Sequence, residues 1–248
     1  MKVWEKILEK IKEKERLHFT LIDPDKQVPE VAGNIAHTSF SAGTDAILVG
    51  GSSATKGNEI EKTIMEIKKR IGRSIPIILF PSGAGALSSL ADAVLFMSLL
   101  NSEDPCYIIR EPAKGTLHIK TMSLETISMG YLVISPGMKV GEVGKANLLK
   151  RDDYREALQY ALFTKYFGAK MLYLEAGSGS PEPVSNEMIG TIKENVEIPL
   201  IVGGGIKDYK TALEKIKAGA DIIVTGNIVE SEGKDRLERI IKAVKEYK

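Results

Sequence analysis

The chain has 248 residues, close to the roughly 250 residues typical of a single (β/α)8 barrel domain. Hydrophobic residues make up 43% and charged residues 27%, which is ordinary globular composition. The formal net charge of +1 provides no global field that would recruit nucleic acid or an anionic membrane. The single cysteine, Cys106, excludes an internal disulfide framework and a metal site built from cysteines.

These properties predict a cytoplasmic enzyme without stable membrane insertion. No apolar run is long enough to cross a bilayer, and the first six residues (MKVWEK) lack the apolar segment of a signal peptide. No linker divides the sequence, so residues 1–248 are expected to form one domain.

The first predicted elements are a helix and a strand. Residues 3–16 carry their apolar side chains on one side, which predicts an extra amphipathic helix across the outside or bottom of the barrel. Residues 17–22 are a predicted strand that ends at Asp23, before Pro24. Catalytic groups gather at the carboxyl ends of barrel strands, so Asp23 is a candidate functional acid. A turn aspartate that bonds its own backbone is an equally good interpretation.

The next predicted strands cover residues 45–49 and 75–81. Glycines and Ser52 follow the first of these strands, and the Ser52 hydroxyl could serve a metal or a phosphate at the same rim as the aspartate. Residues 82–90 are small and glycine-rich and lead into a fourth strand over 93–98. That link is too short for a crossover helix. We therefore expect the third outer helix to be missing or replaced, with a groove left in the barrel wall.

The middle of the chain has the weakest pattern. Prolines and a glycine interrupt residues 103–129, where we expect a short helix over the barrel mouth. Residues 131–135 are the predicted fifth strand. A polar loop follows, and Asp152 or Asp153 is expected to cap the next helix.

A glutamate ends the sixth predicted strand, residues 170–175. Side-chain alternation places Met171, Tyr173 and Glu175 on one face of this strand. A carboxylate inside a barrel mouth is costly unless it is paired or used, so Glu175 is a candidate functional group. A structural ion pair is the alternative. Ser178 and its flanking glycines could donate hydrogen bonds to a phosphate.

Two glycine turns near the end of the chain predict a phosphate site. Residues 198–202 and 220–225 are β-branched runs typical of buried parallel strands, and each stops at a turn before a helix. The turn at 203–205 can bring backbone N–H groups close to an anion, with a helix N-terminus behind them. Thr225 and Gly226 would lie beside it, as in barrels whose last two strands hold a phosphate. Two tight turns without a ligand are the alternative.

Two absences narrow the chemistry. The three histidines, His18, His37 and His118, form no evident metal or triad pattern. No lysine ends an inward-facing strand beside the predicted site, which disfavours Schiff-base aldolase chemistry.

Several motifs then occur in a fixed order through nearly the whole chain. They are 20–26 (TLIDPDK), 43–52 (GTDAILVGGS), 79–83 (LFPSG), 130–137 (GYLVISPG), 173–179 (YLEAGSG) and the two glycine turns. Together these motifs resemble the geranylgeranylglyceryl phosphate synthases, the prenyltransferases of archaeal ether-lipid synthesis. The missing third helix matches the modified α/β barrel of this family.

The resemblance implies transfer of a geranylgeranyl group from geranylgeranyl diphosphate to the 3-hydroxyl of sn-glycerol 1-phosphate, with release of diphosphate. It implies Mg²⁺ as the cofactor, with Asp23 and Ser52 as its ligands. Glu175 would accept the hydroxyl proton, and Tyr173 would line the catalytic site. The residues implied for glycerol phosphate binding are Leu172, Tyr173, Leu174, Glu175, Ala176, Gly177, Ser178, Gly203, Gly204, Thr225 and Gly226.

One branch of the family carries a lysine two residues before the first aspartate, where this chain has Leu21. The chain therefore resembles the other branch, and any diphosphate contact made by that lysine must come from elsewhere. The family forms dimers or hexamers, so we expect self-association.

Three other functions share parts of this pattern. A phosphate-binding barrel isomerase or cyclase would use the same turns for a polar phosphoribosyl metabolite. A flavin-binding oxidoreductase could hold the flavin phosphate there, and a colourless purified protein would count against it. The third is a non-enzymatic assembly or binding module. The polar Asp23 and Glu175 at the barrel mouth disfavour this third function.

Overall fold

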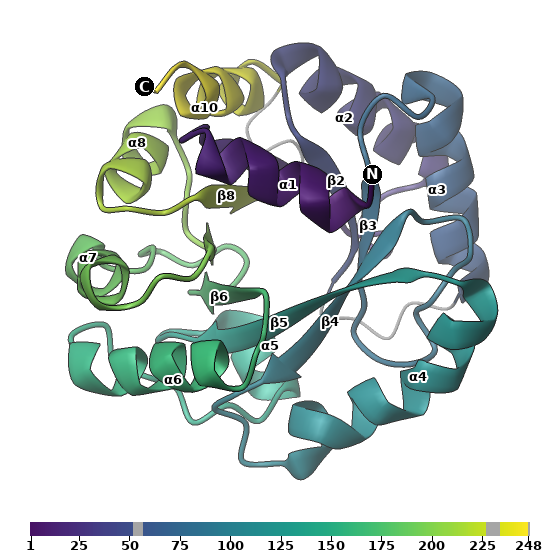
Figure 1. Ribbon diagram of the computed structural model, residues 1–248. Helices are drawn as coiled ribbons and strands as arrows, with labels where there is room; N and C mark the ends of the chain where they lie inside the picture. The colour runs from purple at the N-terminus through teal and green to yellow at the C-terminus, as the bar shows by residue number, and fades with distance from the viewer. Residues whose placement is uncertain (52–56, 227–233, 248) are drawn as a thin grey trace.

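The computed structural model describes residues 1–51, 57–226 and 234–247. Eight parallel strands close into a barrel in the order β1 to β8, because β1 pairs with both β2 and β8 (Figure 1). The strands are β1 (Leu17–Ile22), β2 (Ala46–Gly50), β3 (Ile77–Phe80), β4 (Ala93–Leu99), β5 (Glu125–Val133), β6 (Met171–Glu175), β7 (Leu200–Gly203) and β8 (Ile222–Thr225). The predicted (β/α)8 fold is confirmed.

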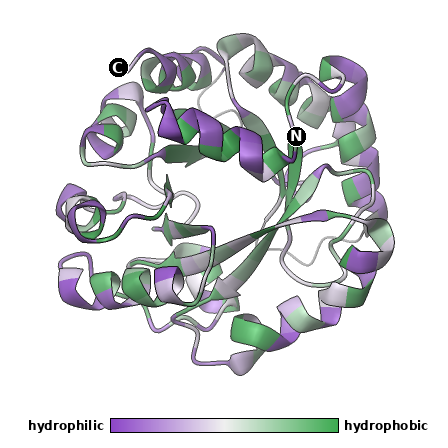
Figure 2. Ribbon diagram, in the orientation of Figure 1, coloured by the Kyte–Doolittle hydropathy of each residue, from purple (hydrophilic) through white to green (hydrophobic). Residues whose placement is uncertain are grey.

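Helices surround the barrel and bury their apolar sides against it, while hydrophilic residues face outward (Figure 2). The helices of the described residues are α1 (Val3–Lys12), α2 (Pro29–Ala42), α3 (Gly57–Ile71), η1 (Cys106–Arg110), α4 (Glu111–Met122), α5 (Met138–Val143), α6 (Tyr154–Tyr166), α7 (Asn186–Asn195), α8 (Tyr209–Lys217) and α10 (Lys234–Glu246). None of these helices has the length and apolar character needed to cross a bilayer.

No helix lies between β3 and β4, as the short link at 82–90 predicted. Residues 81–92 connect β3 to β4 without a helix, and the two strands pair over only two residue positions. The outer face of the barrel therefore has no covering helix between β3 and β4. The nearby helix α4 packs against β4 (Figure 1).

The middle of the chain differs from the prediction. Helical structure runs continuously through η1 and α4, and β5 begins at Glu125 rather than at residue 131. Pro112 does not interrupt the helix because it lies in the first turn, where no backbone N–H is needed. Gly115 is buried against Leu87, so the second apparent helix breaker is a close-packing position.

The N-terminal helix covers the end of the barrel at which the strands begin. The backbone N–H groups of Val3 and Trp4 donate to the Glu125 carboxylate at 2.7 and 2.9 Å. Lys10 pairs with Asp45 at 2.7 Å, and Ile7 is buried in the barrel interior cluster. The expectation that this helix packs across the bottom of the barrel is confirmed (Figure 1).

Candidate active site

Strand order brings most of the predicted functional residues to the opposite end of the barrel. Tyr131 is level with Tyr173, and Glu175 is level with Gly203, on neighbouring strands β5, β6 and β7. β8 and β1 continue the same wall, so Thr225 lies next in order. The carboxyl ends of five adjacent strands therefore supply one continuous surface.

Glu175 is buried among neutral hydrogen-bond donors. Its Oε1 accepts the Gly177 N–H at 2.6 Å, and its Oε2 accepts the Tyr131 hydroxyl at 3.4 Å, with a further side-chain hydrogen bond from Tyr173. Burial raises the pKa of Glu175 above its ordinary value, although these three donors oppose the shift. The Glu175 carboxylate therefore accepts a proton more readily than an exposed glutamate would.

The alternative interpretation of Glu175, a structural ion pair, is not found within the described part of the chain, where its hydrogen-bond partners are the two tyrosines and a backbone amide. Burial also raises the pKa of both tyrosine hydroxyls well above the ordinary value, so they stay protonated and act as donors.

Three aromatic rings form the floor of this end of the site. Phe80 stacks on Tyr173 with ring centroids 5.7 Å apart, and Tyr131 packs edge-on against both rings. Tyr131 was not predicted as a site residue. Alternation along its strand would have identified it, because Tyr131 and Tyr173 occupy equivalent inward positions on neighbouring strands.

The glycine turns pack directly against the two candidate catalytic side chains. A Cβ atom on Gly203 would lie 2.1 Å from the Tyr173 hydroxyl, and one on Gly204 would lie 2.4 Å from Glu175 Oε1. Gly204 also has a φ of +80°, a conformation that other residues rarely adopt. These glycines are therefore required to place Tyr173 and Glu175, in addition to any contact that they make with a ligand.

The Thr225 side chain is held on the outer face of the barrel wall, because its neighbour Val224 faces the barrel interior. Its hydroxyl lies 2.9 Å from His18 Nε2, and His18 Nδ1 lies 2.9 Å from the Thr44 hydroxyl. Burial lowers the pKa of His18 to about 3, so this histidine is neutral. With its hydroxyl engaged by His18, Thr225 can offer a phosphate its backbone N–H more readily than its side chain.

Other predicted glycerol phosphate residues are not all brought together. Leu172, Leu174 and Ala176 belong to the cluster between the barrel and the outer helices, so their side chains face away from the site. Ser178 is exposed and lines the open groove beside Gly226. Residues on the outward face contribute to the site only through the strand that they build.

Asp23 lies at the rim, as predicted. Its Oδ1 accepts the Asp25 N–H at 3.1 Å, so it is also the self-bonded turn aspartate of the alternative interpretation. A Cβ on Gly51 would lie 2.3 Å from Asp23 Oδ2, which shows how closely the carboxylate crosses the end of β2. Burial raises its pKa, while the Asp25 N–H and the charges of Lys26 and Lys139 lower it.

Of the two predicted metal ligands, the structure describes only Asp23. Ser52 lies outside the described residues. Within those residues, no group of three or more His, Cys, Asp or Glu side chains could hold a metal ion. Mg²⁺ commonly binds through one or two carboxylates, with water and substrate phosphates completing its oxygen ligands. Asp23, a carboxylate that lines an open groove, fits that kind of site.

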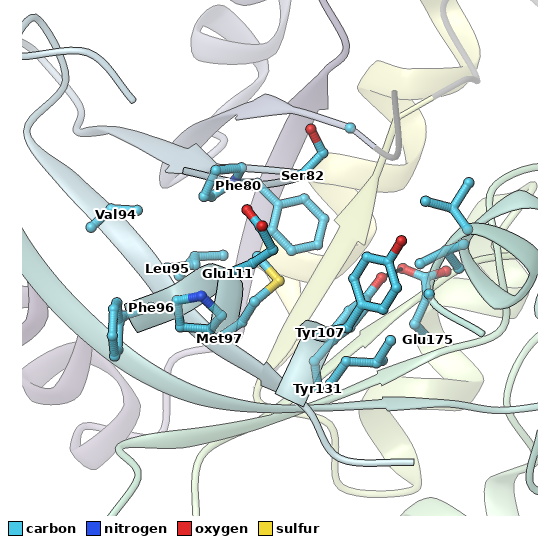
Figure 3. Close-up of a pocket in the computed structure, with 18 of the residues that line it drawn as sticks. Phe80, Ser82, Val94, Leu95, Phe96, Met97, Tyr107, Glu111, Tyr131 and Glu175 are labelled. Atoms are coloured by element: carbon cyan, nitrogen blue, oxygen red, sulfur yellow. Dashed lines mark hydrogen bonds between the residues drawn. The ribbon is translucent and has the colours of Figure 1, made fainter. Parts of the chain in front are cut away.

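An apolar groove runs from this polar end toward the position of the missing helix. Glu175 lies at one end, and Val94 and Phe96 lie toward the other (Figure 3). The groove walls come from β3, β4, residues 81–87 and α4, and its apolar lining includes Phe80, Leu87, Val94, Leu95, Phe96, Met97, Leu99 and Ile119. A long hydrocarbon chain is the kind of ligand that this apolar lining accommodates.

Comparisons with known proteins agree with this geometry. Residues 9–248 match the PcrB family. The chain is 47% identical to the geranylgeranylglyceryl phosphate synthase of Thermococcus sibiricus over 250 residues, covering 99% of this chain and 97% of the relative. The corresponding Thermococcus kodakarensis enzyme is 45% identical over 238 residues, covering 94% of each chain.

Comparison with solved structures finds the same group of enzymes. The (S)-3-O-geranylgeranylglyceryl phosphate synthase of Thermoplasma acidophilum, crystallised with its substrate sn-glycerol-1-phosphate, is 42% identical, with a TM-score of 0.95 and 100% of each chain covered. The tryptophan synthase alpha chain of Legionella pneumophila shares the fold alone, at 14% identity, a TM-score of 0.62 and coverage of 98% of this chain and 97% of that chain. The chain therefore belongs to the PcrB family, together with the geranylgeranylglyceryl phosphate synthases.

Proposed function

We propose that this protein transfers a geranylgeranyl group from geranylgeranyl diphosphate to the 3-hydroxyl of sn-glycerol 1-phosphate and releases diphosphate. The observation that carries the proposal is the continuity of one groove, which joins the buried carboxylate of Glu175 to an apolar channel beside the missing helix. The Thermoplasma acidophilum relative binds sn-glycerol-1-phosphate with the same fold at 42% identity.

The glycine turns are the proposed phosphate site for glycerol phosphate. Backbone N–H groups at Ser178, Gly203, Gly204 and Gly226 lie at the ends of β6, β7 and β8, which are consecutive strands, while the Gly177 N–H is donated to Glu175. Neutral backbone donors bind a phosphate without a counter-charge that would compete with the leaving group.

Glu175 is the proposed general base. As the 3-hydroxyl oxygen forms a bond to C1 of the prenyl group, the C1–oxygen bond to diphosphate breaks and the hydroxyl proton passes to Glu175. The two tyrosine hydroxyls hold the carboxylate toward the substrate, because they donate to it from the floor of the site. The electron pair of the broken bond leaves with the diphosphate.

Mg²⁺ is the proposed cofactor. Asp23 would hold it, together with Ser52, in the arrangement that the family resemblance implies. When bound, the ion supplies positive charge that offsets the negative charge on the leaving diphosphate.

The apolar channel is the proposed prenyl site. Side chains of β3, β4 and α4 surround a hydrocarbon tail there, and each methylene buried contributes about 0.8 kcal/mol. This lining disfavours the alternative function on a phosphoribosyl metabolite, because such a substrate is polar throughout and would leave the channel unfilled.

Self-association and a cytoplasmic location belong to the same proposal. Phe163 and Phe167 stack on the outside of α6 with centroids 5.4 Å apart, next to Tyr166, and all three side chains are exposed. A second copy of the chain would cover such a patch in a dimer or hexamer. Light scattering of the purified protein tests this expectation, and a mass of 27.1 kDa would contradict it.

A product assay by mass spectrometry tests the function. Purified protein receives Mg²⁺, geranylgeranyl diphosphate and one enantiomer of glycerol phosphate at a time. We expect an ether product from sn-glycerol 1-phosphate alone, abolished by a chelator. No product from either enantiomer, with folded protein, would overturn the proposed reaction.

A further inference from the structure

The short helix α5 forms one side of the groove where the apolar channel meets the polar end. Val140, Val143 and Gly144 line the groove from this helix and its C-terminal cap. A Cβ atom on Gly144 would lie 2.4 Å from Leu99 Cδ2, so the end of α5 packs directly against the last residue of β4. The position of α5 therefore sets the width of the groove beside β4.

The other end of α5 packs against the loop that follows Glu175. A Cβ atom on Gly177 would lie 2.6 Å from the Gly137 carbonyl oxygen, and Gly177 donates its N–H to Glu175 at 2.6 Å. The Gly137 N–H donates in turn to the Ala176 carbonyl at 3.1 Å. The helix thus extends from the candidate general base to the end of β4, along the part of the groove that leads to Glu175.

Asn101, which lies two residues beyond β4, joins the segments on both sides of α5. Its side chain is 3% exposed, and Nδ2 donates to the carbonyl oxygens of Val133 and Asn147, both at 2.8 Å. Its Oδ1 accepts the Val133 N–H at 3.1 Å, and its own carbonyl accepts the Asn147 N–H at 2.7 Å. One buried residue therefore connects the end of β5 to the segment that returns after α5.

The contact with Val133 extends the pairing of β5 beyond the end of β4. These two strands pair as far as Leu99 and Tyr131, where β4 ends. On its other side, Val133 is level with Glu175 in β6. A buried backbone N–H without a partner is costly, so the Asn101 carboxamide takes the place of the next β4 residue.

Ser102 attaches the end of α5 to the same point. Its buried Oγ donates to the Gly144 carbonyl at 2.6 Å, and its backbone forms an isolated bridge with Ala146. An ion pair between Lys145 and Asp104 at 2.8 Å also spans this link, but it is exposed to solvent and contributes little. The two consecutive residues after β4 therefore supply the buried polar contacts that hold this end of α5.

We propose that Asn101 and Ser102 are positioning residues for the prenyl donor, because they hold α5 at the distance from β4 at which the reacting carbon of the donor reaches Glu175. This inference rests on the proposed function, since it concerns the binding of the prenyl donor of that reaction. Neither side chain is part of the groove lining. Both act through Val140 and Val143, which border the space for the hydrocarbon chain.

The distance dependence of packing explains the expected effect. Contacts between apolar atoms weaken steeply as a gap opens, so a wall that moves outward loses contact with the hydrocarbon chain. The reaction also requires the reacting atoms to be about 3 to 3.5 Å apart. Glycerol phosphate is proposed to bind at the ends of β6, β7 and β8, and not beside the end of α5 that Ser102 holds. Loosening this end should therefore affect the donor more than the acceptor.

Hydrogen exchange tests the attachment of α5 without any substrate. In Ser102→Ala, the amides of residues 138–149 should exchange about tenfold faster than in the wild type, because one buried hydrogen bond is lost. Ser39→Ala is the matched control, since Ser39 is a buried serine on α2 whose hydroxyl donates to the Ile35 carbonyl at 2.9 Å. This control should leave the exchange of 138–149 unchanged.

Binding and kinetics test the consequence for the donor. Calorimetry with geranylgeranyl diphosphate and Mg²⁺, without glycerol phosphate, should show binding about threefold to tenfold weaker in Ser102→Ala. The KM for the donor should rise by the same factor, and the KM for sn-glycerol 1-phosphate should change less than about twofold. Asn101→Ala should weaken donor binding more, because it leaves the Val133 N–H and the Asn147 carbonyl without this partner. If circular dichroism shows that Asn101→Ala does not fold, Ser102→Ala decides the test.

Three outcomes in Ser102→Ala would overturn the proposal: unchanged exchange of 138–149, faster exchange with wild-type donor binding, and equal weakening of donor and acceptor. The proposed function can fail separately. A protein that makes no ether product, but whose Ser102→Ala variant exchanges faster and binds the prenyl diphosphate more weakly, would reject the proposed function and keep the positioning role. Ether formation with wild-type donor binding in Ser102→Ala would do the reverse.

Discussion

Buried acidic residues have cationic partners at one end of this barrel and neutral hydrogen-bond donors at the other. At the end where strands begin, Asp45 is held by Lys10 and Lys245 at 2.7 and 2.9 Å, and it also accepts the His18 N–H. Asp221 is held in the same way by two cations and the Leu200 N–H. At the end where strands stop, Glu175 is held by tyrosines and an amide.

The acidic residues at the two ends of the sheet therefore have different roles. Paired acids at the start of the strands bind α1, α10 and neighbouring strands together, so they contribute to stability. Buried acids at the end of the strands have raised pKa values, which agree with the proton transfer proposed for Glu175 and the cation binding proposed for Asp23. Substitutions at the two ends should therefore separate stability from turnover.

The largest effect is expected for Glu175→Gln. The amide keeps the shape of the side chain but cannot accept the hydroxyl proton, so kcat should fall by about 10²- to 10⁴-fold. Melting temperature should stay the same or rise, because an ionisable group is removed from a buried position. Glu182→Gln is the control, since Glu182 is an exposed acid on the following loop. Turnover near that of the wild type would remove Glu175 from the mechanism.

The next effect concerns acid stability and His18. The unfolded histidine takes up a proton near pH 6.5, whereas the buried one stays neutral down to about 3. Stability from this residue is complete above pH 6.5 and falls by up to about 1.4 kcal/mol per pH unit below it. Denaturation curves of the wild type and His18→Gln between pH 4 and 8 should converge toward low pH. Parallel curves would contradict a neutral buried histidine.

A smaller loss of stability is expected for Asp221→Asn. The amide oxygen can still accept the Leu200 N–H, but Arg16 and Lys193 lose their counter-charge. The free energy of unfolding should fall by roughly 2 kcal/mol, less than for a fully buried pair because both cations are partly exposed. The kcat should be unchanged.

The control for this change is Glu66→Gln on α3, whose two cationic partners are exposed. Glu66 pairs with Lys69 and Arg70 at 3.4 and 3.3 Å on the surface, where such pairs contribute about 1 kcal/mol or less. A loss at Glu66 equal to that at Asp221 would show that the start of the strands has no special role in stability.

Sequence alone predicted most of the barrel, because most of the strands are short apolar runs, and β1, β2, β6, β7 and β8 end at or next to a glycine or an acid. It misplaced the start of β5, where Glu125 and Ser128 break the apolar pattern but pair in register with β4. It predicted Glu175 from alternation along one strand. It could not predict the bond between His18 and Thr225, which are 207 residues apart in the chain.

The groove was predicted on one side only. A short link at 82–90 implied a missing helix, which is confirmed, but the neighbouring wall is α4, whose Pro112 and Gly115 hid its periodicity. The roles of Asp23, Ser52 and the glycerol phosphate residues remain predictions, because they depend on ligands and not on the chain alone.

The smallest effect tests how the neutral donors act on Glu175. Tyr131→Phe removes the hydroxyl that donates at 3.4 Å, a long hydrogen bond, so kcat should fall only about twofold to tenfold. Because that hydroxyl favours the ionised carboxylate, its loss should raise the pKa of Glu175 further, and the acid limb of the pH–kcat profile should move to higher pH. Tyr173→Phe is the matched variant on the neighbouring strand and should move the limb in the same direction. A lower kcat with an unmoved acid limb in both variants would mean that the tyrosines only pack against Phe80, and that the strand-end acid is tuned by burial and the Gly177 amide alone.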